Sequence, residues 1–230
     1  MEKLAYQLWK KDDANLETFK ELLLKNLSKD IGEFVSELQI NIADADVLPA
    51  NNLAQSNYPP APNAVMFIKV KSYFLADTLE SHLEKITKKI HGFVVSESII
   101  LDDSKKSPLG LRSEGFSQVV FLEKPETMSA FDWFDHWTNY HTEIAIKTQS
   151  NFIYVQNTVV RPLQKSSPSF IAIIEECFPS EAMTDQEVFY DARNNPEQLA
   201  KNAQIMMDSC EKFIDFKKIE VIPTSRYRII

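Results

Sequence analysis

Stretches of alternating or continuous apolar residues are separated along this chain by stretches in which apolar residues recur every three or four positions. In the first half, the strand-like stretches are 4–10, 34–43, 64–74 and 93–101. Apolar residues at helical spacing mark 15–31, where Asn15 is a candidate N-cap, and 77–91. The first half therefore reads as strand, helix, strand, strand, helix, strand.

The same order of elements recurs after a polar segment. Residues 104–115 carry Pro108, Gly110 and Gly115 among charged side chains, which predicts a linker. The predicted strands beyond it are 117–124, 152–161, 170–177 and 216–223, and the predicted helices are 129–148 and most of 180–215. We therefore expect two halves, 1–103 and 116–230, each a ferredoxin-like β-α-β-β-α-β unit.

These two halves predict an α+β fold. In a ferredoxin-like unit both helices cover one face of a four-stranded antiparallel sheet and leave the other face bare. Because the predicted strands are rich in Phe, Ile and Val, the bare face must also be covered. We expect the two fused units to pack sheet to sheet as a dimeric-type, eight-stranded α+β barrel, with room inside for side chains or one small ligand.

Composition narrows the classes of function. The chain has 33 acidic and 25 basic residues and a formal net charge of −8, which argues against nucleic-acid binding. No stretch reaches the roughly 18 apolar residues of a membrane span, and no apolar signal core is present, which predicts a soluble cytoplasmic protein. Cys177 and Cys210 are far apart and no glycine-rich phosphate motif occurs, so disulfide, zinc, dinucleotide and P-loop chemistry are not expected.

The predicted helix 129–148 carries the best candidate for chemistry. At roughly 100° per residue, His141 falls at the centre of the face that holds Phe134 and Trp137, whereas His136 points to the solvent side. A partly buried imidazole can act as a general base or acid, because its surroundings move its pKa across neutrality. The alternative is a core histidine with both ring nitrogens satisfied. With the two histidines on different faces and no HxH or HExxH motif, no metal site is expected.

Two neighbouring strands add polar candidates. Tyr154 and Gln156 share one face of their strand, and the more aliphatic other face suits packing under helices, so we expect both side chains to point into the barrel. Tyr154 could donate to a substrate oxygen, or serve as an aromatic filler. Glu175 and Glu176 end an apolar strand. One of them is expected to face inwards and could orient His141, unless both only mark the exit of the strand into solvent.

Aromatic residues on the predicted helix favour either packing or binding. Trp133, Trp137 and Tyr140 are explained by helix-to-sheet packing, with an aromatic substrate pocket as the alternative. In such a pocket the expected catalytic residues are His141, Tyr154 and Glu175, and the expected substrate-binding residues are Trp137, Gln156 and Glu176.

Several segments of the second half, together with the W-x-x-x-H spacing of Trp137 and His141, resemble one known family. The segments are FLEKPE, FDWFDHWTNYHTEIA, FIYVQNTVVRPL, FIAIIEECF and CEKFIDFKKIEVIPTSRY. In this order they are similar to the EthD-type domain of the dimeric α+β barrel superfamily, over residues 116–227. The first half is similar to the superfamily only in its pattern, because helix 15–31 contains no histidine. At most one site of this kind is therefore expected in the chain.

The resemblance implies a cofactor-free barrel that handles small aromatic or polyketide-like molecules. Related barrels include monooxygenases, cyclases and decarboxylases, and the family's helix histidine corresponds to His141. We expect an enzyme that acts by proton transfer on a small-molecule substrate in the second half, with His141 as base and Tyr154 or a glutamate as helper. The alternative is a non-catalytic binding or accessory barrel in which His141 is a core residue. A fused barrel needs no partner to close. A homodimer that forms through the edges of the barrel is still possible.

Overall fold

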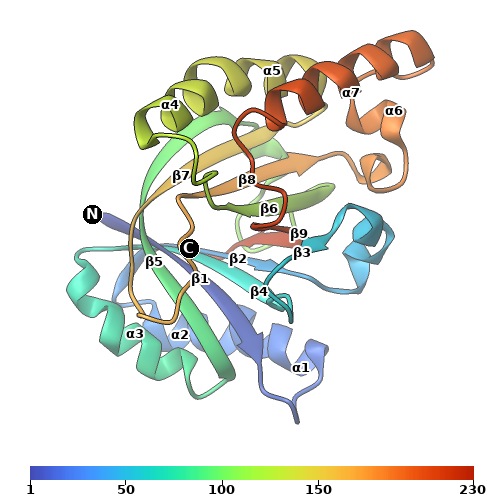
Figure 1. The fold of residues 1–230 in the computed structure, drawn as a ribbon. Helices are drawn as coiled ribbons and strands as arrows, with labels where there is room; N and C mark the ends of the chain where they lie inside the picture. The colour runs from blue at the N-terminus through green and yellow to red at the C-terminus, as the bar shows by residue number, and fades with distance from the viewer.

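One closed antiparallel sheet lies at the centre of the computed structural model, which describes residues 1–230 (Figure 1). The first-half strands are β1 (Glu2–Lys10), β2 (Val35–Ile42), β4 (Ala64–Val70) and β5 (Thr87–Asp102). The second-half strands are β6 (Phe116–Leu122), β7 (Ile153–Pro162), β8 (Ala172–Phe178) and β9 (Ile219–Arg228). Their order is β2-β4-β1-β5-β7-β8-β6-β9, and a β2–β9 pairing closes the ring. The short strand β3 (Gln55–Ser56) adds to β9.

Both halves arrange their strands in the same order: the second, third, first and fourth strands of each half lie side by side. This is the order of a ferredoxin-like unit. The halves meet at two antiparallel seams, β5 with β7 and β2 with β9. The expected α+β barrel is therefore confirmed, and its two sheets close within a single chain.

Helices of the two halves cover opposite sides of the barrel (Figure 1). In the first half they are α1 (Leu16–Glu21), η1 (Leu22–Leu27), α2 (Ser28–Ile31), η3 (Tyr73–Leu75) and α3 (Ala76–Leu83), with the 3₁₀ segment η2 (Ala45–Leu53) in the long proline-rich connection. As predicted, the Asn15 side chain caps α1 by accepting from the backbone N–H of Thr18 at 2.7 Å. The second half contributes α4 (Ala130–Asp135), η5 (His136–His141), α5 (Thr142–Thr148), η6 (Ser180–Met183), α6 (Gln186–Phe189) and α7 (Pro196–Cys210).

The predicted helix 77–91 is shorter than expected. The helix α3 ends at Leu83, and residues from Thr87 onwards belong to β5 and pair with β1. The apolar residues of this segment fit both the helical and the strand period, and the pairing with β1 decides for strand. Gly92, which directly follows the predicted helix, therefore lies inside β5. A Cβ atom there would come within 2.6 Å of the Tyr6 ring, so the close packing requires glycine.

The linker between the halves packs against the end of β9. It contains the 3₁₀ segment η4 (Ser104–Lys106), and the hydroxyls of Ser107 and Ser113 are buried and 2.7 Å apart. Gly115, at its end, has a φ of 65°, and a Cβ there would collide with the carbonyl of Phe178. The linker is thus an ordered part of the fold.

The three largest clusters of apolar side chains lie between sheet and helices in each half and inside the barrel. The middle of the barrel is occupied by residues from both halves, among them Phe67, Phe93, Phe121, Phe170 and Ile173. No helix of the chain is long and apolar enough to cross a membrane. Because the barrel centre is filled with side chains, a ligand site has to be sought at its ends or under the helices.

Candidate functional site

A mainly apolar cavity of about 210 Å³ lies between the second-half sheet and the helical segments η5 and α7. Four of the six predicted site residues line it: Trp137, His141, Tyr154 and Glu176. The rest of the wall is largely aromatic and aliphatic, including Tyr190, Met206, Phe213, Ile214 and Val221. An apolar cavity with a few convergent polar groups is the usual form of a small-molecule site.

Strand register places the polar groups of this cavity in one row. Tyr154 on β7 pairs directly with Glu176 on β8, and Glu176 pairs in turn with Gln118 on β6. Directly paired residues of antiparallel strands point to the same face with their Cβ atoms about 5 Å apart. The three side chains therefore form a polar row across an otherwise apolar surface.

Tyr154 and Gln156 thus point to the face opposite the one expected. Tyr154 packs with Trp133 and Trp137 of the covering helix, and the aliphatic partners Ile153 and Val155 turn towards the barrel. The prediction that Tyr154 and Gln156 face the barrel interior is wrong because both faces of β7 are buried. The more aliphatic face suits a packed barrel as well as it suits a helix.

The Tyr154 hydroxyl belongs to a buried hydrogen-bond chain. It accepts from Nε2 of Gln156 at 3.0 Å, and the same Nε2 donates to the Thr142 hydroxyl at 2.7 Å. Thr142 in turn donates to the carbonyl oxygen of Trp137 at 2.8 Å. Burial and the nearby Glu176 carboxylate raise the pKa of Tyr154 well above its usual value. Tyr154 is therefore held as a neutral hydrogen-bond donor, and Gln156 supports it from outside the cavity wall.

Glu176 is the carboxyl group of the cavity. Its side chain is buried, and its Oε1 accepts one hydrogen bond, from Nδ2 of Asn151 at 2.8 Å. Burial raises the pKa of Glu176 to about 7, with the Asn151 hydrogen bond acting in the opposite direction. Near neutral pH this carboxyl group therefore exists in both protonation states, as a proton-transfer group requires.

His136 and His141 lie on the same side of their helix, although they were expected on different faces. The segment between them, η5, is a π-helix, whose wider turns bring residues four and five apart onto one side, whereas residues five apart diverge on an α-helix. Nε2 of His136 lies 3.2 Å from the Ser209 hydroxyl, and Nδ1 of His141 lies 3.0 Å from the same oxygen. The expectation that His136 points to the solvent side is wrong, because a constant turn of 100° per residue does not hold through a π-helix.

His141 is buried beside Phe213, with 4.6 Å between the ring centroids. Burial lowers the pKa of His141 to about 4, and the neighbouring His136 adds to the effect. The imidazole is neutral at neutral pH. Its hydrogen-bond partner is Ser209, so the expected carboxylate that orients His141 is replaced by a hydroxyl.

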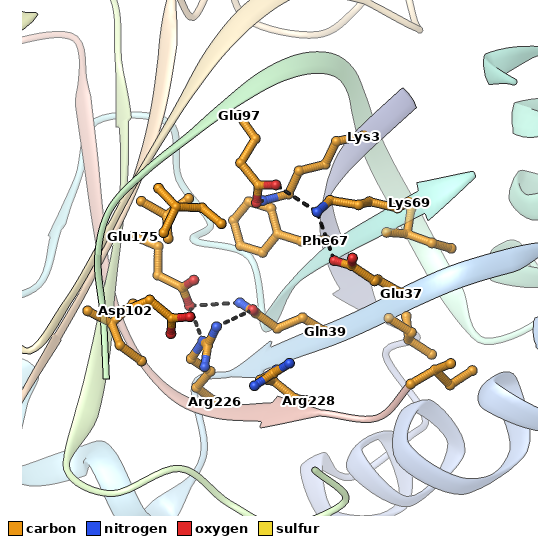
Figure 2. Close-up of a pocket in the computed structure, with 16 residues that line it drawn as sticks. Lys3, Glu37, Gln39, Phe67, Lys69, Glu97, Asp102, Glu175, Arg226 and Arg228 are labelled. Carbon is orange, nitrogen blue, oxygen red and sulfur yellow. Dashed lines mark hydrogen bonds and ion pairs between the residues drawn. The ribbon is translucent and has the colours of Figure 1, made fainter. Parts of the chain in front are cut away.

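Glu175 points away from this cavity, into the end of the barrel (Figure 2). Its Oε1 accepts from Gln39 and Asn41 at 2.8 Å each, from Ser117 at 3.0 Å and from Nε of Arg226 at 3.1 Å. Burial opposes ionisation, but Arg226 and the amide donors hold the pKa of Glu175 below its usual value. Glu175 therefore joins strands of both halves as a permanent carboxylate, separate from His141 and Tyr154.

Some residues of the site had no clear signal in the sequence. Ser209 shares the buried face of α7 with Asn202 and Met206, so helical periodicity alone could have placed it inside. Its contact with histidines about 70 positions earlier depends on packing between helices, which periodicity does not show. Gln118 could have been found only from the register of β6 with β8.

The polar groups that could contact a ligand in the cavity are hydrogen-bond donors and acceptors of four side chains. They are the ring of His141, the Tyr154 hydroxyl, the Glu176 carboxyl and the Gln118 amide. No group of three or more His, Cys, Asp or Glu side chains lies close enough together to hold a metal ion. Cys210 also lines the cavity, and burial raises the pKa of its thiol to about 12.

Comparisons with known proteins match part of the sequence and the whole of the fold. The profile of the EthD domain matches residues 125–217, a range that contains His141, Tyr154, Glu176 and Ser209. No curated protein sequence matches the chain. Among solved structures, the chain is similar to an anthrone oxidase-like protein, with a TM-score of 0.58 and 9% identity over 99% of this chain and 92% of that chain.

Two further structures are similar over nearly the whole length. A candidate monooxygenase from Fusobacterium nucleatum gives a TM-score of 0.54 at 8% identity, over 100% of this chain and 92% of that chain. A chlorite dismutase variant from Candidatus Nitrospira defluvii gives 0.50 at 7% identity, over 98% and 90%. At such identities the likeness shows the fold alone. Residues 125–217 thus match the EthD domain, and the chain as a whole has the dimeric α+β barrel fold, closed within one polypeptide.

Proposed function

We propose that this protein is a small-molecule enzyme that moves a proton on an aromatic or polyketide-like ketone bound in the cavity under η5 and α7. The observation that carries the proposal is the direct pairing of Tyr154 with Glu176 in an apolar cavity that His141 also lines. The EthD domain over residues 125–217 supports an enzyme of the α+β barrel class. The structural likeness to a protein described as anthrone oxidase-like suggests an aromatic ketone as the first probe.

Glu176 is the proton acceptor in this proposal. Its carboxylate takes a proton from an acidic C–H that is conjugated with the carbonyl group, such as the methylene group across the central ring of anthrone, and the electron pair of that C–H bond is delocalised onto the carbonyl oxygen to form an enolate. A base with a pKa near 7 is well matched to this step at neutral pH. His141 is a poor base by comparison, because its pKa lies near 4. In this proposal the base is therefore Glu176, and not His141 as expected from the sequence.

Tyr154 and His141 stabilise the enolate oxygen. Tyr154 stays protonated and can donate its hydroxyl hydrogen to a ligand oxygen, while Gln156 holds the phenol in place. Fixed donors aimed at an oxygen that gains charge lower the barrier most in a site that excludes water. The apolar wall around the polar row supplies such surroundings.

Deuterium exchange tests the proposal without assuming any later step. The protein is incubated with anthrone in deuterated buffer without oxygen, and exchange at the methylene group is followed by mass spectrometry. We expect exchange above the buffer rate with the wild-type protein and a loss of about a hundredfold or more in Glu176→Gln. The control Glu211→Gln changes an exposed carboxyl of the same half and should leave the rate unaltered.

Two outcomes would overturn the proposed enzyme. If anthrone binds but wild-type exchange equals that of buffer, the accessory binding barrel becomes the better account. If Glu176→Gln, shown to be folded, exchanges as fast as the wild-type protein, the base lies elsewhere. The site itself is built from one chain, so a homodimer is not required for either result.

A further inference from the structure

Ser209 connects the two histidines of η5 to the long helix α7. Nε2 of His136 lies 3.2 Å from the backbone carbonyl oxygen of Ser209 and 3.2 Å from its hydroxyl. Nδ1 of His141 lies 3.0 Å from that hydroxyl. One serine therefore contacts both imidazoles, at the point where the π-helix brings them together.

The directions of these hydrogen bonds follow from the carbonyl group. A carbonyl oxygen only accepts, so Nε2 of His136 must carry a hydrogen. That N–H points at the Ser209 hydroxyl as well, and the hydroxyl oxygen accepts it. The single hydrogen of the Ser209 hydroxyl then has Nδ1 of His141 as its acceptor, because the hydrogen bonds of this hydroxyl are with the two imidazoles. Nδ1 of His141 is thus unprotonated.

The protonation of both ring nitrogens of His141 is consequently defined. A neutral imidazole carries one hydrogen, and with Nδ1 as acceptor the hydrogen sits on Nε2. Nε2 has no hydrogen-bond partner in the protein. It is also not fully enclosed by other atoms, so it is accessible from the open space beside the ring. The open space that His141 lines is the cavity with Tyr154 and Glu176.

We propose that Ser209 is a positioning residue that fixes His141 as the neutral Nε2–H tautomer, so that His141 presents a hydrogen-bond donor to an oxygen of the bound ligand. The role in ligand binding rests on the proposed function of the cavity, whereas the tautomer does not. The chemistry that would recognise this donor is a carbonyl or enolate oxygen on an otherwise apolar, flat molecule. Burial of the ring, which lowers the pKa of His141 to about 4, agrees with a neutral donor.

The tautomer can be measured in the ligand-free protein. With ¹⁵N-labelled histidine, two-bond nitrogen–proton correlation spectra at neutral pH distinguish protonated from unprotonated ring nitrogens. For wild-type His141 we expect a protonated Nε2 and an unprotonated Nδ1. In Ser209→Ala the hydroxyl is lost and the spectrum should shift to a mixture of tautomers. The control Ser81→Ala removes an exposed helix hydroxyl that bonds Thr78 and should leave the His141 signals unchanged.

Ser209→Thr keeps the experiment decisive if Ser209→Ala fails to fold. Threonine retains the hydroxyl and should retain the wild-type tautomer of His141. A protonated Nδ1 in the wild-type protein overturns the inference, whichever variant folds. An Nε2–H signal that Ser209→Ala leaves unchanged overturns the role of Ser209.

A matched pair of ligands tests the donor. Anthrone and 9,10-dihydroanthracene have the same three rings, but only anthrone carries a carbonyl oxygen. Because only the Nε2–H fraction of the tautomer mixture can donate to the carbonyl, Ser209→Ala should weaken anthrone binding by the reciprocal of that fraction, about twofold for an equal mixture, and leave dihydroanthracene binding unchanged. Equal weakening of both ligands contradicts the donor role of His141. Absence of wild-type deuterium exchange would instead count against the proposed enzyme and leave the tautomer result standing.

Discussion

Tyr154 and Glu176 are directly paired across β7 and β8, on the face of the sheet that η5 and α7 cover. The pairing joins a phenol that stays protonated to a carboxyl group that titrates near neutral pH. Glu175, the preceding residue on β8, points the opposite way, and its ionised carboxylate bonds Arg226 in the barrel. Adjacent glutamates on one strand thus have separate roles because side chains alternate between its faces.

Replacing Glu176 should change how stability depends on pH. The pKa of Glu176 rises from 4.5 to about 7 on folding, so between these values the folded state binds more protons than the unfolded state. Stability therefore falls as pH rises from about 4.5 to 7, by up to about 3 kcal/mol. Urea denaturation at pH 5 and pH 8 should show the stability of the wild type falling by this amount relative to that of Glu176→Gln, because His141 and the other titrating groups affect both proteins alike. A stability difference that is the same at both pH values would contradict the raised pKa.

His141 should have the opposite effect at acid pH. Its pKa falls from 6.5 to about 4 on folding, so the unfolded state binds more protons between these values, and stability falls as pH drops from 6.5 towards 4. NMR titration of His141 should show a neutral ring at pH 6. A His141 ring that is charged at pH 6 would contradict the burial that the structure shows.

Tyr154→Phe should separate activity from stability. The phenol makes one hydrogen bond, from Gln156, whose amide keeps its bond to Thr142, so the loss of stability should be about 1 kcal/mol. Because the hydroxyl is a donor to the enolate oxygen, the exchange rate should drop about a hundredfold. The control is Tyr140→Phe, at an exposed position of η5. A full exchange rate in folded Tyr154→Phe would remove Tyr154 from the mechanism.

Glu175→Ala should mainly lower stability. The substitution leaves the buried Arg226 without its carboxylate partner, which costs about 3–5 kcal/mol for an uncompensated buried charge. Urea denaturation measures the loss, and anthrone binding to the folded fraction should stay at the wild-type level, because Glu175 lies outside the cavity. Loss of anthrone binding with unchanged stability would show that Glu175 acts on the ligand site.

The order of strands and helices could be predicted from the sequence because each barrel strand contains alternating or continuous apolar residues. Which face of β7 points into the barrel could not be predicted, because Tyr154 packs under a helix and Val155 packs inside a filled barrel, and both environments are apolar. Helical periodicity placed His141 correctly inside. It misplaced His136, because the π-helix between the two residues shifts the phase of the helix.

The pH dependence of anthrone exchange tests most directly whether Glu176 moves the proton. We predict that the wild-type rate rises with pH through an apparent pKa near 7, as the Glu176 carboxyl ionises. His141→Gln should keep that profile at a lower rate, and Glu176→Gln should abolish the enzymatic rate at every pH. A wild-type profile governed by a pKa near 4, lost in His141→Gln and kept in Glu176→Gln, would contradict the account and make His141 the base.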